Sequence, residues 1–169
     1  NLQFDFLGKI NLNPDVPVFD FRLEMQKAMP GKLNLSKNFP NAEMSFVMTA
    51  NFSGNKLDNL AGTILVEDGV YKNRNGELNL EGMELQSITS GPIKYLSFTS
   101  DYFDVEINGN YHFQNILNAF EKSMDRYIPA INYQEIAGAH ENKFGYQIDV
   151  KNLDELSQVF TPNIKIETP

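Results

Sequence analysis

Few side chains in this chain of 169 residues have the type and spacing that catalysis or metal binding requires. His112 and His140 are the only histidines, and neither belongs to a HxxxH or HExxH pattern. The carboxylates of Asp104 and Glu106, which follow Asp101, would lie about 7 Å apart along one side of a strand, as a glycosidase pair could. His112 shares that polar side, so a solvated sheet face accounts for these residues.

Other motifs of enzymes are missing as well. The chain has no GxSxG nucleophile elbow, no P-loop and no GxGxxG. The stretch Glu67-Asp68-Gly69 lacks the alternating oxygen ligands of a calcium loop. Without cysteine, neither a thiolate metal site nor a disulfide can form. We therefore expect no catalytic residue, no metal site, no cofactor and no enzymatic activity.

The composition limits the classes of partner that the protein could bind. The formal net charge is -8 and the isoelectric point is about 4.7, which argues against nucleic acid and against an anionic lipid surface, since both require clustered basic residues. No apolar run approaches the ~18 residues of a membrane span. The chain starts within an alternating pattern, without an initiator Met or a signal peptide, so we interpret residues 1–169 as a single β-rich fragment of a larger chain.

Apolar and polar residues alternate over most of the chain, a pattern typical of strands with one dry and one solvated face. In "YFDVEINGNYHF" the apolar set falls on odd positions and the acidic and amide set on even positions. Four such segments define thirteen dry-face candidates, called here the predicted lining residues. They are Phe19, Phe21, Leu23, Met25, Met44, Phe46, Met48, Phe103, Val105, Ile107, Phe144, Tyr146 and Ile148.

Three local signals interrupt the alternation. The apolar phase changes at Gly82, which predicts a β-bulge. The sequence "NRNG" at 73–76 predicts a tight turn, because Asn-Gly tolerates positive φ. The segment 54–62, "GNKLDNLAG", has two leucines spaced by one helical turn between two glycines, and we interpret it as a structural corner between two strands.

Helical patterns are scarce. The spacing of apolar residues predicts a helix over 116–127, capped by Asn115, and a shorter one within 152–162; a third pattern near 24–40 is weaker. The pattern predicts a repeated unit of strand, short helix and strand. The copies lie near 17–52, 101–133 and 142–167. About eight to ten strands with so few helices predict a mainly β fold, a curled antiparallel sheet with short helices at an edge or end.

The segments "GNKLDNLAGTILVEDGVYKN", "LSFTSDYFDVEINGNYHFQNI" and "FGYQIDVKNLDELSQVFTPNIKIE" resemble the TamB family and its AsmA-like relatives, most of all the TamB-like envelope proteins of the Bacteroides type. The resemblance covers most of the chain and rests on the Leu-x-x-Leu-x-Gly corner and the strand–helix units. It carries no catalytic motif.

The resemblance implies an internal segment of a periplasmic bridge that is anchored in the inner membrane. Such a segment would be a β-taco, or repeating β-groove, that carries phospholipid acyl chains toward the outer membrane. The family also implies a role in outer-membrane biogenesis, as a translocation and assembly module with an outer-membrane barrel partner. The segment 115–127 is long for a groove loop and would cap or plug the channel.

We therefore predict a passive apolar groove lined by the thirteen residues, with head groups at its wet opening. The alternative is a closed-core scaffold module for envelope protein assembly that binds no lipid. A carbohydrate-binding β-sandwich is a further rival, but the polar faces carry few aromatic residues and the chain has no Trp.

Overall fold

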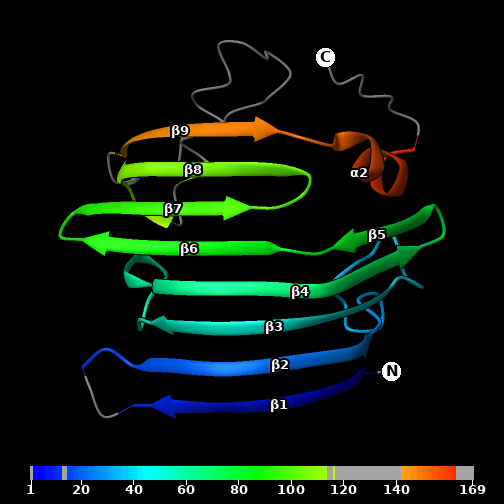
Figure 1. The fold of residues 1–169 in the computed structure, drawn as a ribbon, viewed down its shortest axis with the longest axis horizontal. Helices are drawn as coiled ribbons and strands as arrows, with labels where there is room; N and C mark the ends of the chain where they lie inside the picture. Colours follow the sequence, from blue (N-terminus) through cyan, green and yellow to red (C-terminus); the bar gives the residue numbers. More distant parts are fainter. Residues whose placement is uncertain (1, 13–14, 114–115, 117–141, 163–169) are drawn as a thin grey trace.

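The computed structural model describes residues 2–12, 15–113, 116 and 142–162, and strands dominate this part of the chain (Figure 1). In chain order the elements are β1 (Leu2–Asn11), β2 (Val18–Ala28), β3 (Glu43–Ser53), the 3₁₀ turn η1 (Leu57–Asn59), β4 (Ala61–Asn73), β5 (Gly76–Leu80), β6 (Met83–Ser90), β7 (Ile93–Thr99), β8 (Phe103–Asn110), β9 (Lys143–Val150) and α2 (Leu153–Phe160). The predicted fold class is confirmed: the protein is mainly β.

All nine strands belong to one antiparallel sheet, in the order β1-β2-β3-β4-β6-β7-β8-β9, with β5 also paired to β4. Strands that follow one another in the chain are neighbours in the sheet, except that β5 and β6 lie end to end along β4, so the sheet is a meander. β1 and β9 lie at opposite edges and do not pair with each other, so the sheet is open.

Tight turns set the register of two hairpins. Asn73 pairs with Gly76, so the predicted turn at 73–76 is confirmed as a two-residue loop between β4 and β5. Ser90 pairs with Ile93, which leaves Gly91 and Pro92 as the loop between β6 and β7. Gly91 has a φ of 59°, a value at the first loop position that glycine adopts without steric cost.

The predicted irregularity at Gly82 is present, but its form is not that of a simple bulge. Leu80 pairs with Gly69, and Met83 pairs with Val66, so two residues of each strand lie between the pairs and neither strand has an extra one. Both strands change phase together, and each carries one positive φ, 66° at Gly82 and 50° at Asp68. The register of the long hairpin is therefore preserved across the irregularity.

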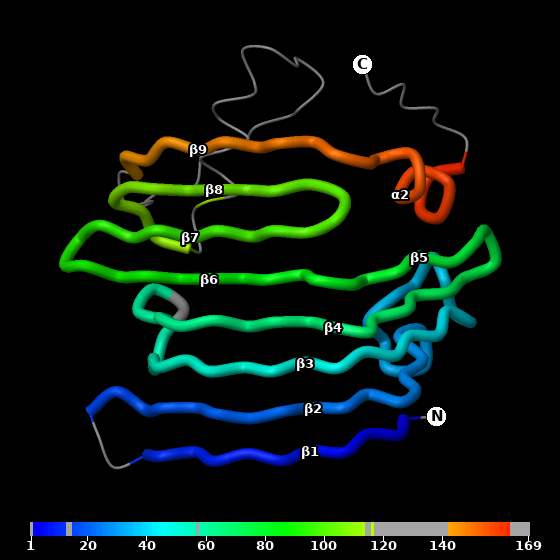
Figure 2. Tube along the Cα trace, viewed as in Figure 1, coloured from blue at the N-terminus to red at the C-terminus, as the bar shows by residue number. Residues whose placement is uncertain are grey.

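The helix within 152–162 is confirmed as α2, which packs on the end of the β4–β5 hairpin. Leu78, Tyr102 and Val159 form the buried cluster there, and the hydroxyl of Tyr102 donates to the carbonyl of Asn79 at 2.5 Å. Figure 2 shows the chain between β2 and β3 gathered at this same end of the sheet. We call it the α2 end.

Two helix predictions have other outcomes. The weak pattern near 24–40 was wrong: β2 extends to Ala28, and residues 30–35 form turns stabilised by bonds such as Leu35 N–H to Pro30 O at 2.9 Å. Proline and glycine at 30–31 explain the failure, because both oppose continuation of a helix. The helix predicted over 116–127 lies, except for residue 116, outside the described residues.

The C-terminal end of α2 is held by two asparagine side chains from the turn between β4 and β5. The amides of Asn73 and Asn75 both donate to the carbonyl of Val159, at 3.0 and 2.9 Å. We expect Asn75→Ala to lower the free energy of unfolding by about 1 kcal/mol, the usual contribution of one hydrogen bond. Urea denaturation would measure this, with Asn51→Ala on the solvated face as the control. An unchanged midpoint would contradict the role of this contact.

Candidate functional site

Strand pairing places all thirteen predicted lining residues on one face of the sheet. Residues directly opposite each other in antiparallel strands share a face, and the pairs connect the strands into continuous rows. One row runs Ile10, Phe19, Phe52, Gly62, Ser87, Leu96, Ile107, Tyr146, and the next runs Gly8, Phe21, Ala50, Ile64, Leu85, Phe98, Val105, Ile148. We call this surface the dry face.

Residues on the interior strands of the dry face are more buried than those on its two edge strands. Ala50 and Ile107 are 0% and 8% exposed. Phe6 on β1 is 53% exposed, and Ile148 on β9 is 45% exposed. A continuous apolar surface of this kind is a candidate for binding apolar ligands.

Elements at both strand ends border the dry face. At the α2 end, Phe160 contacts Tyr71 and Phe39, with ring centroids 5.3 and 6.0 Å apart. At the opposite end, where β4 begins, Leu60 and Phe113 lie over the sheet. We call this the η1 end; it is the left end in Figure 1. The apolar surface between these borders runs across the strands, from β1 to β9.

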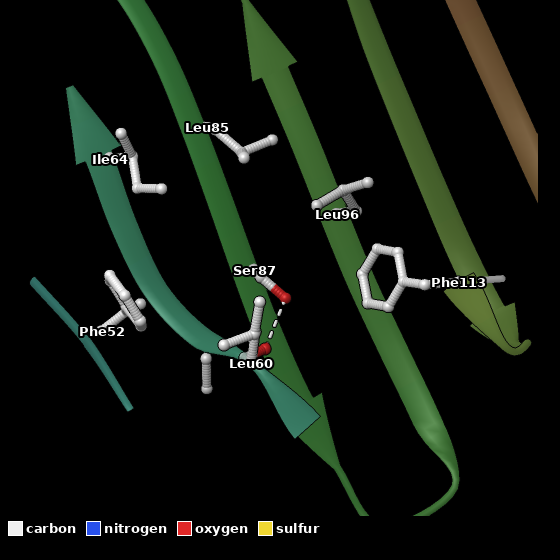
Figure 3. Close-up of a pocket in the computed structure, with 9 residues that line it drawn as sticks. Phe52, Leu60, Ile64, Leu85, Ser87, Leu96 and Phe113 are labelled. Atoms are coloured by element: carbon white, nitrogen blue, oxygen red, sulfur yellow. Dashed lines mark hydrogen bonds between the residues drawn. The ribbon is translucent and has the colours of Figure 1, made fainter. Parts of the chain in front are cut away.

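The dry face carries an apolar pocket of about 210 Å³ at the η1 end. In Figure 3, Phe52 lies on one side of it and Phe113 on the other, with Ile64, Leu85 and Leu96 across the strands between them. The hydroxyl of Ser87 donates to the carbonyl of Leu60 at 2.7 Å, so this polar group is already satisfied. The pocket therefore presents almost only carbon to a ligand.

The predicted corner at 54–62 is confirmed, and it also places the carboxylate of Asp58 against the backbone of Phe113, one of the residues that line this pocket. Asp58 of η1 accepts bonds from Lys94 Nζ at 2.7 Å and from the backbone N–H of Phe113 at 2.9 Å. Its second oxygen lies 3.2 Å from Nδ1 of His112. Lys94 also donates to the carbonyl of Tyr111 at 2.6 Å. Asp58 thus joins three segments that are far apart in sequence.

The environment shifts the pKa of two groups in this cluster. Burial alone would raise the pKa of Asp58, but the hydrogen bonds from Lys94, Phe113 and His112 outweigh it and lower this pKa to about 2. Burial, followed by the negative charge of Asp58, raises the pKa of Tyr111 to about 12. Asp58 therefore stays ionised and Tyr111 stays neutral at ordinary pH.

The lowered pKa of Asp58 predicts a dependence of stability on acid. Because the folded-state value lies below the model value of 3.8, this carboxylate stabilises the fold above pH about 4, and that contribution is lost as the pH falls toward about 2. We expect Asp58→Asn to be less stable than the parent at pH 7 and nearly equal to it at pH 2. Urea midpoints across this range would measure the difference, and a constant difference would contradict the assignment.

The other candidates from the sequence lie apart from the dry face. Asp104 and Glu106 are on the solvated face, as expected, and Asp104 forms an ion pair with Lys151 at 2.7 Å. His112 contacts Asp58 rather than only solvent, which corrects the interpretation of this residue as a solvated side chain. His140 lies outside the described residues. In the described part of the chain, no group of three or more His, Asp or Glu side chains is arranged to hold a metal ion.

Sequence reasoning missed several residues of the pocket, among them Ile64, Leu85, Leu96 and Phe113. Ile64 lies in the run "TILVE", where apolar residues fill both faces, so alternation alone does not select one. Lys94, Leu96 and Phe98 do alternate, and the register then puts them on the dry face. Because segment 94–98 begins with a charged residue, its alternation was not recognised as that of a strand with one dry face.

Comparisons with known proteins found nothing similar. No family model, no curated protein and no solved structure matches this chain. Across the described segments, no helix has the length and apolar character needed to span a membrane.

Proposed function

We propose that this protein is a segment of a TamB- or AsmA-like periplasmic bridge whose dry face carries phospholipid acyl chains by passive contact. The observation that carries the proposal is the continuous apolar face across all the paired strands. Transfer of each CH₂ group from water to such a surface stabilises it by about 0.8 kcal/mol. The free energy gained by an acyl chain of ordinary length would therefore be enough to keep it bound without a covalent bond to the protein.

The borders at the two strand ends support a path across the strands rather than along them. A chain that follows the dry face meets Phe160 at the α2 end and Phe113 at the η1 end. Toward β1 and β9 it meets further rows made mainly of apolar side chains, and the exposed Phe6 and Ile148 lie at those edges. We propose that acyl chains enter and leave at the edge strands, where their head groups remain in water. No energy-coupling motif occurs in the sequence, so direction would come from other parts of the assembly.

The closed-core scaffold is the second candidate. Its support is the buried cluster of Leu78, Tyr102 and Val159, which is packed like an ordinary hydrophobic core. That cluster is confined to the α2 end, whereas half-buried Phe, Met and Leu side chains extend over β2 and β3. The groove explains this exposed apolar surface, and the scaffold does not.

The remaining features of the proposal rest on the family resemblance. They are the inner-membrane anchor, the periplasmic location, the outer-membrane barrel partner and the role in outer-membrane biogenesis. A non-enzymatic role is part of the same proposal, and it is supported by a dry face that offers apolar side chains rather than nucleophiles or paired acids.

Site-specific photo-crosslinking in cells tests the groove. A photoreactive residue at Ile148 should capture phospholipid, because this side chain is on the dry face and 45% exposed. The same residue at Gln147, exposed on the opposite face of β9, is the matched control. Capture at both positions, or at neither, would reject the groove in favour of non-specific contact or of the closed scaffold. Ile107, at 8% exposure, is too buried to be a fair probe.

A further inference from the structure

One cation lies on the dry face. Lys94 pairs directly with Thr89 on β6 and with Gly109 on β8, and Leu96 of the apolar pocket lies two positions further along the same face of β7. Its side chain is only 9% exposed. Among the strand residues whose pairing is described, it is the sole charged side chain on this face.

The ammonium group of Lys94 is held by several contacts, whereas its counter-ion, Asp58, is more exposed to solvent. The side chain of Asp58 is 32% exposed, against 9% for Lys94. An ammonium has three N–H donors, and the described residues occupy two of them, through Asp58 at 2.7 Å and the Tyr111 carbonyl at 2.6 Å. Nζ also lies 5.4 and 5.6 Å from the ring centroids of Tyr111 and Phe113. One donor therefore remains for an anion beside the pocket wall.

Two buried hydroxyls, on residues that contact or pair with Lys94, add a second, independent observation. The Oγ1 of Thr89 and the hydroxyl of Tyr111 are both buried and have no hydrogen-bond partner within the described part of the chain. Burial of a hydroxyl without a partner is costly, so such groups often mark a ligand or water position. Thr89 is the direct cross-strand neighbour of Lys94, and the backbone carbonyl of Tyr111, not its hydroxyl, accepts the hydrogen bond from Lys94 Nζ.

From these contacts we infer that Lys94 binds the anionic group of an amphipathic ligand whose apolar chain fills the pocket between Phe52 and Phe113. The ligand class is a long-chain carboxylate or phosphate, and this inference rests on the proposed acyl-chain function. Asp58 is the counter-ion of Lys94 within the protein. It stabilises the buried ammonium when no ligand is bound, and its own negative charge limits the affinity for a second anion.

Calorimetric titration of the purified protein at pH 8 tests the inference with oleate, oleyl alcohol and dodecyl phosphate. Oleate and oleyl alcohol share a chain and differ in charge. We expect oleate to bind about tenfold tighter than the alcohol, the effect of one charge-assisted hydrogen bond. Lys94→Met should remove this preference and leave the alcohol unchanged, whereas Asp58→Asn should strengthen oleate binding. A higher affinity for dodecyl phosphate than for oleate would identify phosphate as the recognised group.

The controls separate this inference from the proposed function. Lys72→Met removes an exposed lysine on the solvated face, paired with Glu77 at 3.4 Å, and should change nothing. The double variant Asp58→Asn/Lys94→Met removes both charges. It controls for the unpaired Asp58 carboxylate that Lys94→Met alone would leave. Equal binding of oleate and alcohol by the parent would overturn the role of Lys94 alone. Failure of both ligands to bind would overturn the acyl-chain function and this inference with it.

Discussion

Replacing Leu85 with glutamate should abolish lipid capture by a photoreactive residue at Ile148. Leu85 lies in the middle of the dry-face row, between Ile64 and Phe98, and it lines the apolar pocket. A carboxylate there must keep its water, because burial of an unpaired charge costs several kcal/mol. An acyl chain that crosses this row would lose its contact with the pocket, so we expect at least a tenfold drop in captured lipid, measured by mass spectrometry of the crosslinked protein.

The matched control for Leu85→Glu is Gln86→Glu, one residue along β6. Gln86 is on the opposite face of the sheet, where it pairs with Thr63 and Ser97, so the same charge should leave lipid capture unchanged. Circular dichroism of both variants would verify that the sheet is intact. If a folded Leu85→Glu protein still captures lipid at the parental level, acyl chains do not cross this row and the groove proposal fails.

Leu78→Ala should cause the largest loss of stability among single substitutions in the described core. Leu78 is 1% exposed and packs with Tyr102 and Val159, so its removal leaves a cavity as well as lost apolar burial. Such truncations cost about 2–5 kcal/mol. Urea denaturation would show the lower midpoint, and α2 should lose its contact with β5.

The control for Leu78→Ala is Leu35→Ala, since Leu35 is 77% exposed and its truncation should change the free energy of unfolding by less than about 0.5 kcal/mol. Lipid capture at Ile148, at the far edge of the sheet, should survive Leu78→Ala under conditions where the protein remains folded. Equal effects of the two substitutions would mean that α2 is not anchored through Leu78.

The dry face divides into regions with different roles. The α2 end is packed like an ordinary core, around Leu78, and there stability and helix docking depend on each other. The η1 end combines an apolar pocket with the ion pair of Asp58 and Lys94. The rows between these ends reach both edge strands. This arrangement leaves the dry face open between its ends, while the α2 end supplies stability.

The sequence by itself determined the strands and the composition of their two faces. Alternation is a local property, because successive side chains of a strand point to opposite sides. The thirteen predicted lining residues therefore share a face wherever their strands pair. Local turn chemistry likewise determined the hairpin at 73–76 and the corner at 54–62. The residues of the dry face can thus be identified from the sequence before any strand pairing is known.

Only the tertiary structure decided which strands are neighbours and what lies at their ends. The order of nine strands connects segments through registers that no short window of sequence specifies. Asp58 meets Lys94 across 36 positions and His112 across 54, and Asn75 meets Val159 across 84. Such contacts form because the folded sheet brings chain ends and corners together. For that reason the sequence indicates an apolar face, whereas the pocket, the buried cation near it and the borders of the dry face emerge only from the fold.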